Sequence, residues 1–69
     1  MPHITIQMIP GRTDAQKREM ALGVQAFLSQ TYGIETKFTS VAVEDVPMDR
    51  WKDEMAKVRD ETVFVRAET

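Results

Sequence analysis

The chain contains no cysteine and only one histidine, His3. No disulfide and no thiolate zinc site can therefore stabilise it, and a single imidazole cannot hold a metal ion without further ligands. These absences matter because the chain has only 69 residues, and a domain of this size buries only about 60% of the surface of its unfolded chain. We expect residues 1–69 to form one domain that has no metal site and gains stability by self-association.

The sequence also lacks a long apolar run and an excess of positive charge. No segment approaches the roughly 18 to 20 apolar residues of a membrane-spanning helix, and no basic segment followed by a hydrophobic stretch marks a secretion signal. Nine basic and eleven acidic residues give a net charge of −2, which provides no general attraction to nucleic acids or anionic membranes. We therefore expect a cytoplasmic protein that binds neither.

The first half of the chain has the pattern of a strand followed by a helix. Residues 2–8 alternate between apolar and polar side chains, which is the period of a half-buried strand. The segment from Thr13 to Gln16 has the form of a capping box, in which both side chains bind backbone N–H groups at the start of a helix. Gly33 is placed to end this helix in a left-handed conformation. The apolar stripe predicted for the helix comprises Met20, Ala21, Val24, Phe27, Leu28 and Thr31.

β-Branched residues return after the helix. Residues 38–46 predict a second strand, so that the chain forms an α+β subunit of β-α-β type with parallel strands and a right-handed crossover. Pro47 ends this strand, and Asp49 is placed to cap a short second helix that carries Trp51. Residues 62–65 indicate a C-terminal strand, which we expect to pair with the sheet edge of a neighbouring subunit.

One face of the predicted sheet has no helix to cover it. The alternation assigns Thr5, Gln7, Ala42 and Glu44 to that face. A sheet of two strands with one uncovered face is not stable in isolation, and these side chains are more polar than an ordinary core. We expect the face to be shared between a subunit interface and a cavity.

Pro2 is the strongest candidate for a catalytic residue. When a small residue follows the initiator methionine, the methionine is usually removed, and the chain then begins with a free prolyl secondary amine. An α-amino group is ordinarily protonated at neutral pH. Burial in an apolar pocket and a nearby cation such as Arg12 would both disfavour the ammonium form and produce a base poised near neutrality. The alternative is a proline that opens an edge strand and has no functional role.

Several stretches of the sequence resemble the 4-oxalocrotonate tautomerase family. These are Pro2-His3-Ile4-Thr5-Ile6, Pro10-Gly11-Arg12-Thr13-Asp14, Gln16-Lys17 and Thr39-Ser40-Val41. The resemblance implies a tautomerase-like subunit assembled as a dimer or as a trimer of dimers. It also implies an enol–keto tautomerase that acts on a small 2-oxo acid or its enol without a cofactor. Pro2 would be its general base and acid, and Arg12 would bind a substrate oxygen.

The sequence departs from that family in the second strand. Its best-known members carry a second arginine where this chain has Ala42, and alanine cannot bind a carboxylate. Since a charge-assisted hydrogen bond contributes about 1.5 to 3 kcal/mol, its loss favours a monocarboxylate over a dicarboxylate substrate. The segment Val41-Ala42-Val43-Glu44-Asp45-Val46, with Trp51 five residues beyond it, resembles a branch of short bacterial tautomerases that also lacks this arginine, and the resemblance implies a dimer. We therefore expect a homodimer first and a hexamer second.

Trp51 and Arg50 are the remaining candidates for substrate binding. By resemblance, Trp51 takes the place of an aromatic pocket residue that excludes water and keeps the Pro2 amine neutral; the alternative is an ordinary core residue of the short helix. Arg50 is a candidate replacement for the missing cation, although adjacent helical residues point about 100° apart and cannot both face one pocket squarely. We expect His3 to be structural.

Two other functions stay open. A dehalogenase or decarboxylase of the same superfamily would use the prolyl ammonium as an acid, together with a residue that activates water. A non-catalytic oligomeric binding module is the other, because a fold does not guarantee an active site. Retention of Met1 would favour that module, since Pro2 would then carry an ordinary amide nitrogen.

Overall fold

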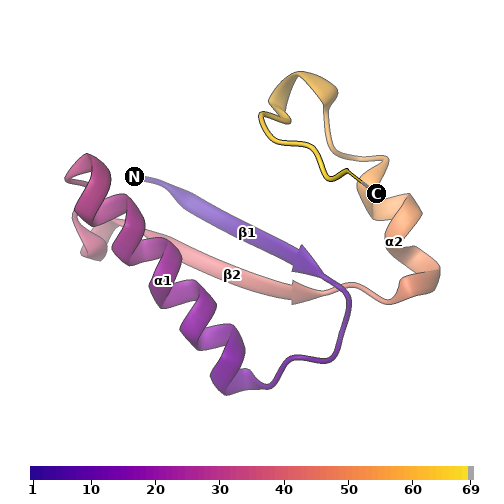
Figure 1. The fold of residues 1–69 in the computed structure, drawn as a ribbon, viewed down its shortest axis with the longest axis horizontal. Coiled ribbons are helices and arrows are strands. Elements are labelled where there is room, and N and C mark those ends of the chain that lie inside the picture. The colour runs from indigo at the N-terminus through magenta and orange to yellow at the C-terminus, as the bar shows by residue number, and fades with distance from the viewer. Residues whose placement is uncertain (69) are drawn as a thin grey trace.

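A computed structural model describes residues 1–68. Its elements are β1 (His3–Met8), α1 (Asp14–Tyr32), the 3₁₀ turn η1 (Thr36–Phe38), β2 (Ser40–Asp45), α2 (Met48–Met55) and the 3₁₀ turn η2 (Asp60–Thr62). α1 runs along the two strands, α2 lies beyond the carboxyl ends of the strands, and the C-terminal segment turns back from α2 on the side of β1 (Figure 1). The predicted β-α-β fold with a short second helix is confirmed.

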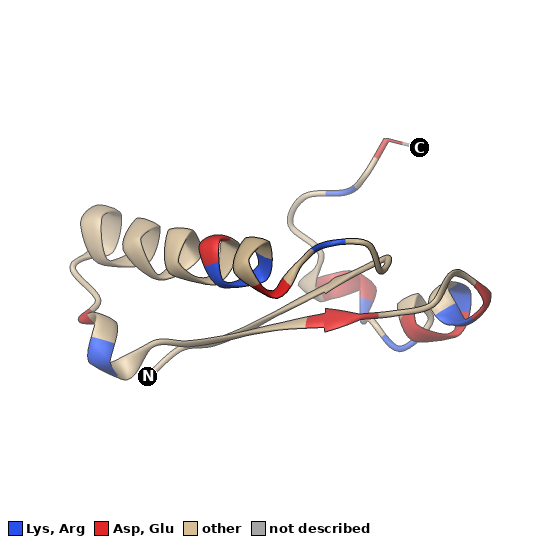
Figure 2. Cartoon of the chain, turned by 90° about the horizontal axis from the view of Figure 1, so that it is seen from below, with Lys and Arg blue, Asp and Glu red and all other residues tan. Residues whose placement is uncertain are grey.

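The two strands are parallel, as predicted, and their register decides which side chains share a face. The Cα partners are His3 with Ser40, Ile4 with Val41, Thr5 with Ala42, Ile6 with Val43, Gln7 with Glu44 and Met8 with Asp45. α1 lies over the face that carries Val41 and Val43, and no element of residues 1–68 covers the opposite face (Figure 2). We call that opposite face, which carries the side chains of His3, Thr5, Gln7, Ser40, Ala42 and Glu44, the open face.

The predicted second strand is too long at both ends. β2 begins at Ser40, because Phe38 belongs to the turn η1 and donates its N–H to the carbonyl of Glu35 at 3.1 Å. Val46 follows the strand and donates its N–H to the carbonyl of Met8 at 2.8 Å. The ladder is thus six residues long on each side.

Both ends of α1 form as predicted. The N–H of Gln16 donates to the Thr13 hydroxyl at 3.1 Å, and the N–H of Thr13 donates to the Gln16 amide oxygen at 3.0 Å. At the other end, Gly33 has φ 70° and donates its N–H to the carbonyl of Ser29 at 2.9 Å. Glycine adopts this left-handed conformation without a steric penalty, so the helix ends there.

The predicted apolar stripe of α1 is wrong at Phe27 and Thr31, which are exposed. Phe27 lies 56% exposed and meets the ring of Tyr32 edge-on, with 6.1 Å between ring centroids. The half-buried side of the helix is centred near Leu28 and Val24. Because adjacent helical residues point about 100° apart, Phe27 cannot share the face of Leu28.

Asp49 does not cap α2. The helix already begins at Met48, with Pro47 as the residue before it, and the carbonyl of Pro47 accepts the N–H of Arg50 at 2.9 Å. Proline is tolerated at a helix start because an N–H there would have no helical partner. Asp49 instead lies in the first turn, where the helix dipole favours a negative charge.

The predicted C-terminal strand at residues 62–65 is absent from the described chain. Thr62 lies in η2, and the N–H groups of Thr62 and Val63 bond to the carbonyls of Arg59 and Asp60 at 2.9 and 3.1 Å. Within residues 1–68 this segment pairs with neither β1 nor β2, which form a sheet of two strands. Phe64 and Val65 are 92% and 89% exposed, and their pairing with a second subunit stays a prediction.

The chain has very little core of its own. Among the described residues, Val46 at 5% and Thr39 at 7% relative exposure are the only buried ones. The accessible surface is 5850 Å², whereas a compact monomer of this mass exposes about 4,400 Å². No helix within residues 1–68 is long and apolar enough to cross a membrane.

An ion pair fastens the start of α1 to the end of β2. Lys17 Nζ donates to Asp45 Oδ2 at 2.7 Å. The hydrogen bond to Asp45 raises the pKa of the Lys17 ammonium above its ordinary value of 10.5, partial dehydration opposes that shift, and the charges of Asp45 and Asp14 reinforce it. The pair thus favours the folded state while Lys17 stays protonated.

This contact predicts an alkaline loss of stability. Because the pKa of Lys17 is higher in the folded chain, the contribution of the pair is complete below the unfolded pKa and disappears as pH rises through the folded pKa. We expect the melting temperature of the wild-type chain to exceed that of Asp45→Asn by a small margin at pH 8. Melting curves of both chains between pH 8 and 12 should show this margin closing at the alkaline end, and a constant margin would contradict the assignment.

Candidate active site

Pro2 lies at the amino end of β1 and is half-buried. Its carbonyl accepts the N–H of Ser40 at 3.2 Å, which fixes the start of the strand against β2. Met1, which precedes it, is 99% exposed. The peptide bond between Met1 and Pro2, whose cleavage would free the Pro2 nitrogen, therefore follows an exposed residue.

Arg12 lies at the other end of the sheet, in the connection between β1 and α1. Gly11 has φ 137°, a conformation that side chains of L-residues rarely adopt, so the turn before Arg12 depends on glycine. A surface hollow of about 340 Å³ is lined by Met8, Ile9, Pro10, Gly11 and Arg12. In the described chain Arg12 forms no ion pair with another residue, and it is exposed to solvent.

Trp51 and Arg50 lie on α2, beyond the same carboxyl end of the sheet (Figure 1). Trp51 is half-buried, whereas Arg50 is exposed. Adjacent positions on a helix give this difference, because the two side chains point about 100° apart.

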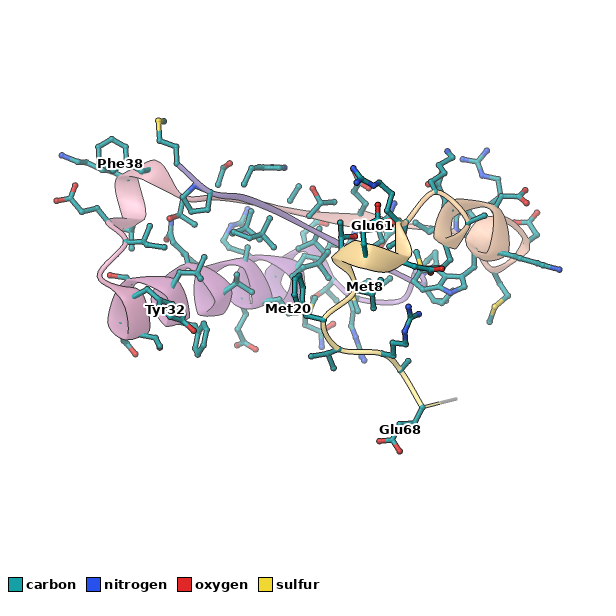
Figure 3. All side chains as sticks on the ribbon, turned by 90° about the horizontal axis from the view of Figure 1, so that it is seen from above. Met8, Met20, Tyr32, Phe38, Glu61 and Glu68 are labelled. Atoms are coloured by element: carbon teal, nitrogen blue, oxygen red, sulfur yellow. The ribbon has the colours of Figure 1, made fainter. Side chains whose placement is uncertain are left out.

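The single chain does not bring the predicted site residues together. Pro2 precedes β1 and Arg12 follows it, and a strand of six residues is roughly 17 to 20 Å long. Figure 3 shows the same separation through labelled neighbours, with Phe38 at the amino end of the sheet and Met8 near its carboxyl end. Within residues 1–68, Pro2 therefore lies at the opposite end of the sheet from Arg12 and Trp51.

The open face carries polar contacts that the sequence pattern did not identify. His3 Nδ1 lies 2.6 Å from Ser40 Oγ, and His3 Nε2 lies 3.1 Å from Thr5 Oγ1. Further along, Gln7 Nε2 donates to Glu44 Oε1 at 3.3 Å. The signal for these pairs is the register, since His3 and Ser40 become opposite partners once the strands are aligned in parallel.

Other chemistry on the described residues is sparse. No group of three or more His, Asp or Glu side chains within residues 1–68 is arranged to hold a metal ion. Glu44 and Asp45 point to opposite faces of β2, as adjacent strand residues do, so they form no carboxylate pair.

Comparison with known proteins identifies relatives over most of the chain. The family described as "Tautomerase enzyme" matches residues 2–59. A probable tautomerase of Xylella fastidiosa is 38% identical over 55 residues, which cover 80% of this chain and 67% of that protein. The 2-hydroxymuconate tautomerase of Bacillus subtilis is 33% identical over 51 residues, which cover 74% of this chain and 82% of that protein.

Solved structures agree with the sequence relatives. The crystal structure of YwhB, a homologue of 4-oxalocrotonate tautomerase, superimposes with a TM-score of 0.68 at 32% identity and covers 72% of this chain and 82% of that one. A 4-oxalocrotonate tautomerase isozyme from Methylibium petroleiphilum gives a TM-score of 0.67 at 32% identity, covering 72% of this chain and 81% of that one. The family match begins at Pro2 and includes Arg12, Arg50 and Trp51. The chain therefore belongs to the tautomerase family, whose members resemble 4-oxalocrotonate tautomerase, and it is an isomerase of that family.

Proposed function

We propose that this tautomerase interconverts a small 2-oxo acid and its enol, with the mature amino-terminal nitrogen of Pro2 as base and acid, and that it needs no metal or organic cofactor. One observation carries the proposal. Pro2 stands at the amino end of β1, directly after the exposed Met1, and is half-buried and held by Ser40. Removal of Met1 would leave a secondary amine at the place where the family match begins.

The reaction needs one proton carrier and one cation. The neutral Pro2 nitrogen takes the proton of the enol hydroxyl, and the freed electron pair forms the carbonyl while the C=C pair takes a proton back from the prolyl ammonium at carbon. In this mechanism Arg12 donates to the substrate oxygen on which negative charge develops. Preorganised donors of this kind contribute about 3 kcal/mol, or roughly a hundredfold in rate.

The site would be assembled from two copies of the chain. Pro2 and Arg12 lie at opposite ends of β1, so two chains related by a twofold axis would each place their own Pro2 beside the partner's Arg12 and Trp51. The surface supports this arrangement. The excess over a compact monomer, about 1,400 Å², exceeds the roughly 800 Å² per partner that a standard interface buries. A homodimer is the first form that we propose, and a hexamer is the second.

Ala42 affects which substrate the site would favour. It lies on the open face opposite Thr5, where it supplies no charge. Arg12 would then be the main cation of the site, with the exposed Arg50 as a further candidate, and Trp51 would form its apolar wall. This composition favours an enol with one carboxylate and an apolar substituent over a dicarboxylate.

An enol panel tests the reaction class. We expect ketonisation of the enol of phenylpyruvate, followed by its ultraviolet absorbance, to proceed with a higher kcat/KM than ketonisation of 2-hydroxymuconate. The intact mass of the native chain, measured in parallel, should show that Met1 is removed. Turnover of a halogenated acrylate without enol ketonisation would favour the dehalogenase instead, and a chain with retained Met1 and no turnover would favour a binding module.

A further inference from the structure

The mature amino terminus must be held in a fixed position, because the first residues of a chain are poorly ordered unless contacts hold them in place. In the proposed mechanism the reacting nitrogen belongs to the first mature residue. Apart from that amine, the carbonyl is the sole backbone group through which Pro2 can bond. A catalytic group must nevertheless be held within about 0.5 Å of its productive position.

Ser40 provides two points of attachment for the dipeptide Pro2-His3. Its backbone N–H donates to the Pro2 carbonyl at 3.2 Å. Its hydroxyl lies 2.6 Å from His3 Nδ1, on the residue that directly follows. One residue of β2 thus binds the backbone of the first mature residue and the side chain of the second.

The imidazole of His3 is itself held at both nitrogens. Nδ1 faces the Ser40 hydroxyl, and Nε2 lies 3.1 Å from the Thr5 hydroxyl on the same face of the sheet. Each hydroxyl can either donate or accept. The ring therefore keeps both partners in either neutral tautomer and as the imidazolium, and the attachment does not depend on one protonation state.

We propose that His3 and Ser40 are positioning residues that hold the Pro2 nitrogen in place for proton transfer, an inference that rests on the proposed function. The two residues act on Pro2 and not on the substrate. Their loss is expected to slow the chemical step while substrate binding, which depends on Arg12 and Trp51, is preserved.

The kinetics of four variants test this proposal. Ser40→Ala and His3→Leu are each expected to lower kcat for phenylpyruvate enol about tenfold, since misplacement by even 1 Å can cost about a hundredfold, with KM changed less than about twofold. Ser40→Thr keeps a hydroxyl and should recover most of kcat. Gly33→Ala, which strains the left-handed end of α1 but removes none of the hydrogen bonds of His3 and Ser40, is the stability control and should keep the wild-type kcat.

The outcomes separate this inference from the proposed function. If Ser40→Ala and His3→Leu keep the wild-type kcat while acetylation of Pro2 stops turnover, the positioning role is wrong and the proline mechanism stands. Equal slowing of Ser40→Ala and Ser40→Thr would also overturn it, because the hydroxyl would then be irrelevant. If wild-type turnover itself survives acetylation of Pro2, the proposed function fails first.

Discussion

Acetylation of the Pro2 nitrogen is expected to lower kcat/KM for enol ketonisation by at least about a hundredfold, because proton transfer by a positioned group contributes roughly 10² to 10⁴ in rate. An amide nitrogen has no available lone pair and cannot accept the proton. The chain is short enough for chemical synthesis, so two chains of residues 2–69 that differ only in an acetyl group can be compared. Stopped-flow absorbance of the enol measures the difference.

Two further chains make this comparison specific. A synthetic chain with Pro2→Ala keeps a primary amine at the same position and should retain part of the activity, since it can still carry a proton. A chain that keeps Met1 should behave like the acetylated one, because its Pro2 nitrogen is again an amide. Undiminished turnover by the acetylated chain would remove Pro2 from the mechanism.

The second large effect is expected at Arg12. Arg12→Ala should reduce kcat/KM by about a hundredfold, the usual cost of losing a donor to developing negative charge. Arg18→Ala is the matched control. Arg18 is also an exposed arginine, and it lies on α1 shortly after the connection that carries Arg12. Steady-state kinetics with one enol substrate measure both variants, and an equal loss in the two would indicate a general effect of net charge.

Mixing two inactive chains tests where Arg12 acts. If Pro2 and Arg12 of one site come from different chains, a heterodimer of acetylated chains and Arg12→Ala chains contains one intact site and one doubly defective site. Random pairing of equal amounts then restores about a quarter of wild-type activity after unfolding and refolding together. A mixture that stays inactive would contradict the shared site.

Local patterns predicted those parts of the fold that local forces determine. The alternation of β1 and the capping box of Thr13 and Gln16 depend only on residues a few positions apart, and both form as predicted. The error at Asp49 is also local, since Pro47 allowed the helix to begin two residues earlier than a cap at Asp49 would. Phe27 was misplaced because its spacing fits two neighbouring faces of the helix, and only packing against the sheet selects one.

The candidate site was harder to predict because its parts do not meet in one chain. Sequence resemblance made Pro2 and Arg12 candidates, and the predicted strand at residues 2–8 already lay between them, but the sequence does not show whether both residues of one site come from the same chain. The contact between His3 and Ser40 depends on the register of two strands far apart in sequence. Residues 62–65 pair with no strand of the described chain, and an apolar pattern alone does not show whether a segment will find a strand edge.

Val46 is the sole buried apolar side chain among residues 1–68. This small core affects how stable a newly made chain is before it meets another copy. Burial of apolar surface is the main force that opposes the entropy of the unfolded chain, and in the proposed homodimer most of it would come from association. Folding would then obey mass action, so freshly synthesised chains at low abundance would stay exposed to proteases until they meet another copy. The amount of enzyme in a cell would consequently rise more steeply than its rate of synthesis.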